Sequence, residues 1–292
     1  MTVQETSIAP GRSVPTGEAA IPGPENPGGP VLVGQRNHRG YALKAYAAAG
    51  TSQDGPCLVF IHGMMEGWEI WERICREYLT EYSVHFLEFP WMGRQGNLWG
   101  FAAQPEEWIR EGLALLPREP VAVVAHSFGA NALLEHFCRN GAGSVKRAAL
   151  LSPFYKKTYA GFDWDTFCHY VGNLGKFMEE CLKVRQGNRP MPREILDSVS
   201  AKVKDQLGVL GWLHFFNCYT RMPGLDLASL RARFLVLGGR DDFSALAEDA
   251  EDLARGLPGC AAHILSDCGH FCMLERPNEV IAILSPFLAS RI

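Results

Sequence analysis

The sequence predicts an α/β fold in which a mostly parallel, twisted sheet carries helices on both faces. Short apolar runs alternate with helical stretches along most of the 292 residues, and this rhythm is typical of parallel sheets wrapped on both sides. Residues 57–63 and 121–126 are apolar almost throughout, as expected of strands that are buried on both faces. One stretch, residues 154–230, breaks the rhythm because it has helical patterns and no strand signal.

The elements can be placed in chain order from Val31. Residues 31–35 and 41–47 flank the turn-like segment RNHRG and predict a β-hairpin. The remaining expected elements follow from the same patterns. In order they are a strand at 57–63, a helix at 68–79, a strand at 82–89, a helix at 104–116, a strand at 121–126, a helix at 129–140, and strands at 145–153 and 233–239, then a helix at 245–257, a strand at 261–266 and a helix at 275–288.

These elements divide the chain into a tail, a core and an insertion. Residues 1–30 are rich in Pro and Gly and poor in large apolar side chains, so we expect a flexible N-terminal tail. Residues 31–153 and 231–292 form the predicted core. Residues 154–230 are too long for a connection between two strands, and we expect them to form an all-helical lid or cap.

Composition excludes several classes of protein. The net charge of −4 is spread along the chain without a basic stripe, so a nucleic-acid partner is not expected. No apolar run reaches the roughly 18 residues that cross a bilayer, and the N-terminus lacks the pattern of a signal peptide. The default expectation is therefore a cytoplasmic protein without a membrane span.

The nine cysteines show no metal-ligand spacing, and we expect free thiols in a reducing compartment. Cys268 and Cys272 flank His270 and leave a metal site as the alternative, but the spacing matches no zinc ribbon or finger. No metal and no tightly bound cofactor are expected.

Reactive side chains are expected where parallel strands end, because that edge of the sheet carries the sites of open α/β folds. Ser127 lies at such an end, between a buried strand and a helix, with Ala125 and Gly129 two residues away on either side. Small residues at these places suit a sharp turn that would lift the serine hydroxyl off the sheet. By itself the pattern equally fits a serine that only caps the next helix.

A nucleophilic serine needs a base, and the base needs an acid that orients it. His270 lies in a loop between the last predicted strand and the last helix, and Asp241 and Asp242 follow the strand at 233–239. These residues favour the interpretation of Ser127 as a nucleophile over that of a helix cap. They leave the choice between the two aspartates open.

Four motifs in this order resemble the α/β-hydrolase family from about Val31 to the C-terminus, most weakly in the insertion. They are FIHG, AHSFG, LVLGGRDD and GHFCMLERPNEV. The resemblance implies catalytic Ser127, Asp242 and His270, because the family's acid stands three residues after the glycine that matches Gly239; Asp241 is the alternative. It also implies an oxyanion hole formed by the backbone N–H groups of Met64 and Phe128. His62 and His126 are then expected to have structural roles.

The aromatic side chains of the insertion predict an apolar pocket for a bulky or long substrate. We expect its lining to include Trp68, Trp91, Phe154, Trp212 and Phe216, with core packing as the alternative for Trp68. Five basic residues would form either a rim for an acyl carrier protein or coenzyme A, or an ordinary solvated face. They are Lys156, Lys157, Lys176, Lys183 and Arg185.

The resemblance implies a serine hydrolase that cleaves an ester or thioester of an apolar acyl substrate through an acyl-enzyme. A C–C bond hydrolase and a cyclising, off-loading thioesterase use the same three residues and remain alternatives. A hydrolase-like receptor that senses a ligand is an alternative from a different class.

Overall fold

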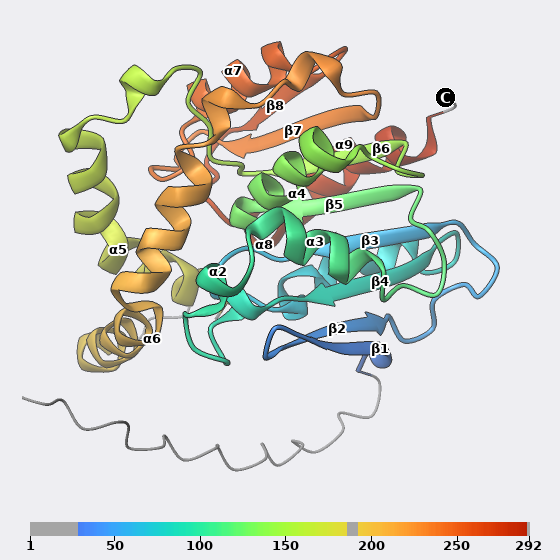
Figure 1. Cartoon of the computed structure of the whole chain (residues 1–292), viewed down its shortest axis with the longest axis horizontal. Helices are drawn as coiled ribbons and strands as arrows, with labels where there is room; N and C mark the ends of the chain where they lie inside the picture. Colours follow the sequence, from blue (N-terminus) through green and yellow to red (C-terminus); the bar gives the residue numbers. More distant parts are fainter. Residues whose placement is uncertain (1–28, 186–191, 291–292) are drawn as a thin grey trace, which may run out of the picture.

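In the computed structural model, residues 29–185 and 192–290 are described, and they contain one eight-stranded sheet with the order β1-β2-β4-β3-β5-β6-β7-β8. The hairpin β1–β2 is antiparallel and joins β4 in antiparallel register, whereas all pairings from β4 to β8 are parallel (Figure 1). The predicted mostly parallel sheet is confirmed. The strands are β1 (Val31–His38), β2 (Tyr41–Ala47), β3 (Cys57–Ile61), β4 (Ser83–Glu88), β5 (Ala122–His126), β6 (Arg147–Leu151), β7 (Arg233–Gly239) and β8 (Ala261–Leu265).

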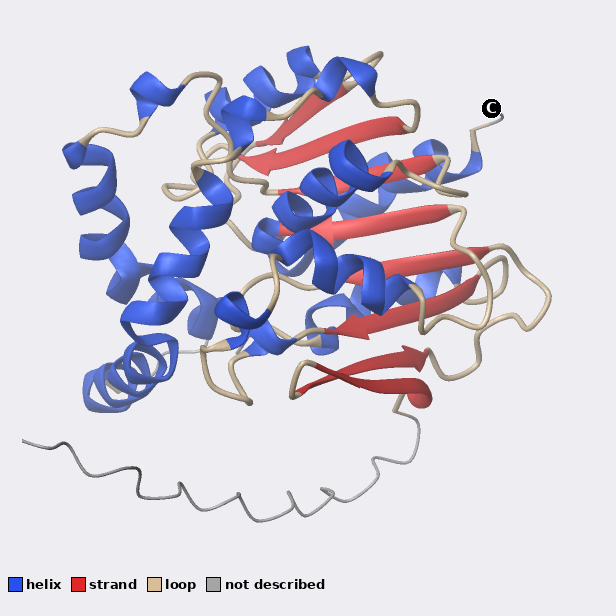
Figure 2. Ribbon diagram, viewed as in Figure 1, coloured by secondary structure: helices blue, strands red, loops and turns tan. Residues whose placement is uncertain are grey.

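Helices cover both faces of the sheet because its central strands are apolar on both sides. In β5, Val123 and Ala125 belong to one hydrophobic cluster, and Ala122 and Val124 belong to a second cluster on the opposite face. This alternation is the two-residue period of a strand. The first cluster is closed by α3 (Pro105–Leu113), α4 (Ser127–Asn140) and α7 (Ala247–Gly256), and the second by α1 (Glu72–Cys75), α8 (Cys272–Glu275) and α9 (Pro277–Ala289). Figure 2 shows the two helical layers with the sheet between them.

The helical insertion, residues 154–230, contains α5 (Trp164–Arg185), α6 (Arg193–Tyr219) and three short 3-10 turns, with no strand in its described residues 154–185 and 192–230. Figure 1 shows α5 and α6 beyond the edge of the sheet at which the parallel strands end. Helix α6 bends at Gly208, whose φ of 57° interrupts the helix. The side-chain amide of Asn97 donates to the carbonyl groups of Gln206 and Leu207 at 2.5 and 2.6 Å, next to this bend.

The helix expected at 68–79 is divided into three short pieces, a 3-10 turn at Trp68–Trp71, α1, and a second 3-10 turn at Arg76–Tyr78. Trp68, Trp71 and Ile74 recur every three residues, the period of a 3-10 helix, which places their side chains on one face. Trp71 and Ile74 are fully buried. A short helix that the sequence pattern did not indicate, α2 (Trp99–Ala102), follows β4 and packs near α6 through Gly100 and His214.

The expectations of a flexible tail and of no membrane span concern residues that are only partly described. Most of the predicted tail, residues 1–28, lies outside the described residues. Within the described ranges, no helix is both long and apolar enough to cross a membrane.

Candidate active site

Four loops at the carboxyl ends of parallel strands bring the predicted site residues together. Met64 follows β3, Ser127 follows β5, Asp242 follows β7 and His270 follows β8. Because these strands lie in one sheet and point the same way, the loops meet at one edge although they are far apart in sequence. The helical insertion lies over this same edge (Figure 1).

Ser127 is the first residue of α4 and has a φ of 52°. This left-handed conformation is unfavourable for a residue with a Cβ atom, and it is the strain expected of a sharp turn from strand to helix. Gly129 explains the small-residue pattern, because a Cβ there would lie 2.3 Å from the carbonyl oxygen of His62. The turn therefore packs directly against the loop after β3.

His270 connects Ser127 to Asp242. Its Nε2 lies 3.0 Å from Ser127 Oγ, and its Nδ1 lies 2.7 Å from Asp242 Oδ2. A carboxylate can only accept, so Nδ1 carries the proton and Nε2 is left to accept the proton of the serine hydroxyl. Because both ring nitrogens face these two partners, the alternative in which His270 joins Cys268 and Cys272 as a metal ligand has no geometric support. Within the described residues, no group of three or more His, Cys, Asp or Glu side chains could hold a metal ion.

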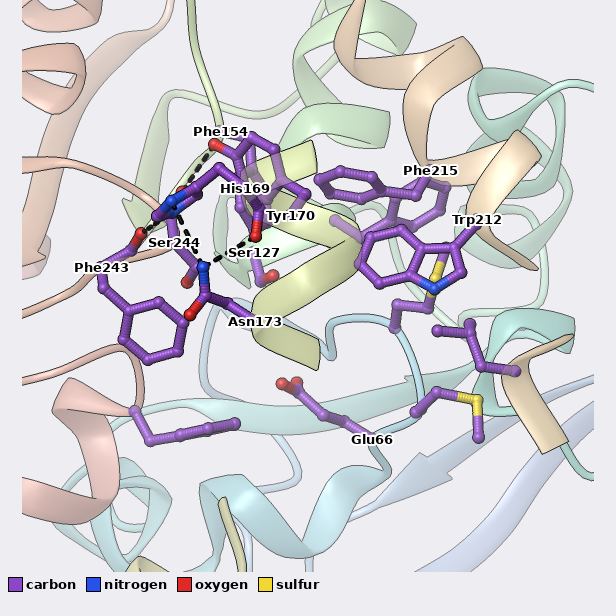
Figure 3. Close-up of a pocket in the computed structure, with 15 residues that line it drawn as sticks. Glu66, Ser127, Phe154, His169, Tyr170, Asn173, Trp212, Phe215, Phe243 and Ser244 are labelled. Carbon is purple, nitrogen blue, oxygen red and sulfur yellow. Dashed lines mark hydrogen bonds between the residues drawn. The ribbon is translucent and has the colours of Figure 1, made fainter. Parts of the chain in front are cut away.

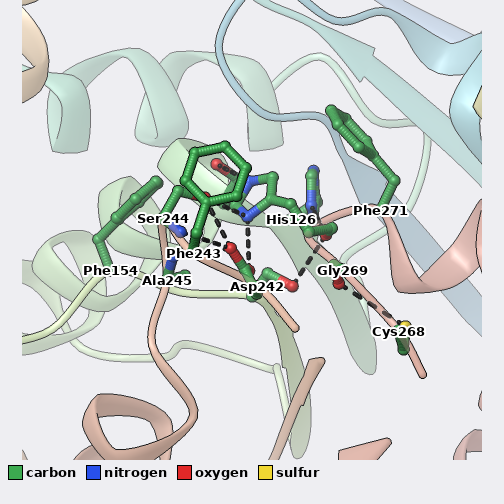
Figure 4. Close-up of polar contacts among 12 residues, drawn as sticks. His126, Phe154, Asp242, Phe243, Ser244, Ala245, Cys268, Gly269 and Phe271 are labelled. Carbon is green, nitrogen blue, oxygen red and sulfur yellow. Dashed lines mark hydrogen bonds and ion pairs between the residues drawn. The ribbon is translucent and has the colours of Figure 1, made fainter. Parts of the chain in front are cut away.

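The two aspartates after β7 lie in different environments. Asp242 is 3 % exposed, whereas Asp241 is exposed to solvent. The Oδ1 atom of Asp242 accepts hydrogen bonds from the backbone N–H groups of Ser244 and Ala245, each at 2.9 Å, and from the Ser244 hydroxyl at 2.7 Å (Figure 4). These three bonds leave Oδ2 directed at His270. Ser244 was not singled out from the sequence, although a serine two residues after an aspartate is a common Asx-turn signal.

The Asp242–His270 pair favours its charged forms. Burial alone would raise the pKa of Asp242, but His270 and the hydrogen bonds from Ala245 and Ser244 outweigh it and hold the pKa below its ordinary value. Burial alone would lower the pKa of His270, but the charge and hydrogen bond of Asp242 outweigh it and raise the pKa above its ordinary value. The environment thus stabilises the imidazolium that forms when His270 takes a proton.

Two backbone N–H groups are available near Ser127. Those of Met64 and Phe128 have no hydrogen-bond acceptor among residues 29–185 and 192–290, and Phe128 lies in the first turn of α4, where helix N–H groups point outward. The neighbouring Met65 N–H donates to Trp91 O at 2.8 Å, which fixes the loop after β3. This pair of donors fits the predicted oxyanion hole.

His62 supports the loop that carries Met64. Its Nε2 accepts the backbone N–H of Phe89 at 3.1 Å, so its proton lies on Nδ1, which donates to the Gly63 carbonyl at 2.7 Å. Burial lowers the pKa of His62 and favours this neutral form. His62 therefore acts as a brace of the loop, in agreement with the structural role expected from the sequence.

A pocket opens between Ser127 and the helical insertion. The empty space inside it is about 740 Å³, a figure that includes open solvent at its mouth. Phe154 and Trp212, both predicted from the sequence, line it (Figure 3). Most other lining side chains are apolar and were not predicted. Examples are Met65, Leu207, Phe215, Phe243 and Phe271.

Three of the aromatic residues expected in the pocket lie elsewhere. Trp91 is 1 % exposed and stacks on Phe89 with ring centres 4.3 Å apart, within the core. Trp68 packs on Phe86, and Phe216 packs on Trp212 within the insertion. Their periodic spacing in the sequence does not distinguish a side chain that lines a cavity from one that packs beside it.

Polar groups from α5 lie at the pocket wall. His169 Nε2 contacts the Phe243 carbonyl at 2.8 Å, and the Asn173 amide donates to the His169 carbonyl at 2.8 Å (Figure 3). Because the Phe243 carbonyl accepts, Nε2 carries the proton. Helix α5 is therefore attached to the loop that carries Asp242.

The structure describes the side chains of two of the five basic residues that would form either a rim or a solvated face. Lys156 is paired with Asp249 at 2.6 Å and ties the start of the insertion to α7. Lys157 is exposed, and the side chains of Lys176, Lys183 and Arg185 lie outside the described part of the chain.

The model of the alpha/beta hydrolase family matches residues 58–283, and the chain belongs to this family. Its core has the mostly parallel sheet that the sequence predicted, with Asp242 after β7 and His270 after β8.

Individual relatives are more distant. A segment of 65 residues is 32 % identical to monoacylglycerol lipase abhd6-B of Xenopus laevis, and the match covers 22 % of this chain and 19 % of that protein. A putative lipase from Acinetobacter baumannii superposes with a TM-score of 0.64 at 21 % identity, over 89 % of this chain and 91 % of the other. A meta-cleavage product hydrolase from Pseudomonas fluorescens superposes with a TM-score of 0.62 at 16 % identity, over 88 % and 97 %. At these identities, the structural likeness shows a shared fold.

Proposed function

We propose that this protein is a serine hydrolase that cleaves an ester or thioester of a bulky or long apolar acyl group, with Ser127, His270 and Asp242 as its catalytic residues. The observation that carries the proposal is the chain of hydrogen bonds from Asp242 through His270 to Ser127, which ends in an apolar pocket. A serine hydroxyl becomes a nucleophile when a base is within hydrogen-bond reach and is itself oriented by a third group.

The reaction then takes two steps. Ser127 Oγ attacks the carbonyl carbon while His270 Nε2 takes its proton, and the N–H groups of Met64 and Phe128 bind the oxygen that becomes negative. His270 returns the proton to the leaving alcohol or thiol, and Ser127 keeps the acyl group. Water next attacks the acyl-enzyme, again giving a proton to His270, and the acid is released with Ser127 restored.

The pocket supports an apolar acyl group. Phe154, Trp212 and Phe215 contribute large apolar surfaces around the entrance to Ser127, and burying such a group gains roughly 25 cal/mol per Å² of apolar surface. We propose that the helical insertion acts as the lid over this pocket, since α5 contributes His169 and Tyr170 to its wall and α6 contributes Leu207. With Lys156 engaged by Asp249, the described residues give no specific support for a carrier protein or coenzyme A.

Turnover of p-nitrophenyl esters of increasing acyl length, compared with the matching acyl-coenzyme A thioesters, tests the substrate class. We expect an initial burst of p-nitrophenol, a preference for medium or long acyl chains, and no turnover by Ser127→Ala. Turnover of neither class by a protein whose serine is reactive would contradict the ester and thioester proposal, and would favour C–C bond hydrolysis or ligand sensing.

A further inference from the structure

A second buried pair of ionisable residues lies beside the proposed catalytic residues. Glu66 is 4 % exposed and His126 is fully buried. Glu66 Oε2 lies 2.9 Å from His126 Nδ1 and also accepts the backbone N–H of Gly63 at 2.6 Å. On its other side, His126 Nε2 lies 3.0 Å from the carbonyl oxygen of His270.

The hydrogen-bond partners of His126 fix the orientation of its ring. A carbonyl oxygen can only accept, so Nε2 must carry a proton to bind His270 O. Burial alone would raise the pKa of Glu66, but the charge and hydrogen bond of His126 outweigh it and hold the pKa below its ordinary value. Glu66 is then a carboxylate 2.9 Å from His126 Nδ1. Loss of the carboxylate would remove the partner that orients the His126 ring from this side.

The pair connects three of the four segments that form the site. Glu66 belongs to the loop that carries Met64, His126 directly precedes Ser127, and the acceptor is the main chain of His270. The rings of His126 and His270 have centres 4.8 Å apart. Stability alone is a weak reason to bury such a pair, because the desolvation of ionisable groups offsets much of the gain from their contact.

The His270 loop has no regular secondary structure of its own and is held by side chains. Glu275 accepts the backbone N–H groups of Gly269 and Phe271 at 2.8 and 3.0 Å. The His270 carbonyl accepts from His126 and from the Ser152 hydroxyl, the latter at 2.9 Å. His126 and Ser152 thus both help to fix the peptide from which the imidazole of His270 reaches Ser127.

We infer that Glu66 and His126 are positioning residues: Glu66 orients the His126 ring, and His126 holds the His270 peptide so that His270 Nε2 stays within reach of Ser127. The inference rests on the proposed function, because it assigns the pair a role only through the reactivity of Ser127. Glu66 also accepts the Gly63 N–H of the loop that carries Met64, so the inference concerns the part of its effect that acts through His126.

A double-mutant cycle on the rate at which diisopropyl fluorophosphate modifies Ser127 tests this inference without knowledge of the substrate. We expect Glu66→Gln to slow modification about tenfold and His126→Phe about a hundredfold, because small displacements of a catalytic group cost factors of this order. In the double variant, the slowing should be smaller than the product of the two single effects, because the two residues act in part through one contact. Modification by Glu66→Gln at the wild-type rate would overturn the inference, as would an equal effect of Glu66→Gln in both backgrounds.

Further variants separate positioning from stability. Glu88→Gln removes another buried carboxylate, which pairs with Lys44 at 3.2 Å in β2 and β4, and should leave the modification rate unchanged. If His126→Phe does not fold, Glu66→Asp keeps the charge but shortens the reach, and it should also slow modification; a wild-type rate there would overturn the inference. On an active ester, Glu66→Gln should lower kcat with little change in KM. Absence of modification in the wild type would instead refute the proposed function.

Discussion

Asp242 and His270 are joined by a 2.7 Å hydrogen bond although 28 residues separate them in the chain. The contact depends on how closely the loops after β7 and β8 approach one another. A Cβ atom on Gly239, the last residue of β7, would lie 2.1 Å from the Cys268 carbonyl oxygen and 2.3 Å from that of Gly269. The backbone at the end of β7 therefore touches the backbone of the loop that carries His270.

Gly239→Ala should displace the His270 loop and reduce kcat by about a hundredfold, because a shift of about 1 Å in a catalytic group has an effect of this size. Gly238→Ala is the matched control, since a Cβ there meets only Ile264 at 3.4 Å and Ala250 at 3.6 Å. Steady-state kinetics of the two variants on the same ester measure the difference. Equal activities would contradict the role that we assign to the close approach.

Asp242→Asn should reduce kcat by about 10⁴-fold, the size of effect known for the loss of the orienting acid in a serine triad. Asp241→Asn should have little effect, because Asp241 is exposed. The rates of both variants on one ester check this difference. A larger loss in Asp241→Asn would mean that the acid was assigned to the wrong residue.

The pH profile of kcat/KM should report the environment of His270. Burial lowers the pKa of His270 and Asp242 raises it by more. His270 must be neutral to accept a proton, so activity should fall as the pH drops through a value above the ordinary histidine pKa of about 6.5. In Asp242→Asn the remaining activity should fall at a lower pH, because the partner that raises the pKa is gone. An unchanged acid limb in this variant would argue against His270 as the titrating base.

Ser127→Gly should be about 1 kcal/mol more stable than Ser127→Ala, because residue 127 has a φ of 52° and glycine adopts this conformation without the strain of a Cβ atom. Both variants should lack activity. Thermal unfolding of the two proteins measures the difference in Tm. Equal stabilities would mean that the turn relaxes when the hydroxyl is removed.

Trp212→Ala should lower kcat/KM for long-chain esters by about 10- to 100-fold more than for acetate esters, the range expected when a pocket loses apolar contacts. Trp212 lines the pocket, whereas Trp164 is 74 % exposed and lies outside it. Trp164→Ala is therefore the control and should leave the ratio of long-chain to short-chain activity unchanged. An equal change in both variants would contradict the placement of the acyl group against Trp212.

Much of the core could be predicted from the sequence because its signals are local. Apolar strands such as 57–63 and 121–126 and the small residues around Ser127 each reflect a requirement of one segment, and the order of four short motifs was enough to relate the chain to its family. The division of the 68–79 helix into short pieces was missed because periodicities of three and 3.6 are hard to distinguish over three turns.

The contacts that complete the site could not be predicted in the same way. Glu66 acts through His126, at the end of another strand, and nothing in its own segment says which partner it meets. Phe154 and Trp212 were assigned to the pocket together with Trp68, Trp91 and Phe216, which pack outside it. Apolar character predicts that a side chain is buried, but only the three-dimensional packing decides whether it faces a cavity.

The central claim is that Ser127 is an activated nucleophile. Reaction of the folded wild-type protein with a fluorophosphonate, followed by mass-spectrometric mapping of the adduct, tests this claim most directly. The account predicts one adduct, on Ser127, that is lost when His270 is replaced by alanine in a variant that still folds. An unmodified wild-type protein, or an adduct on another residue, would contradict it.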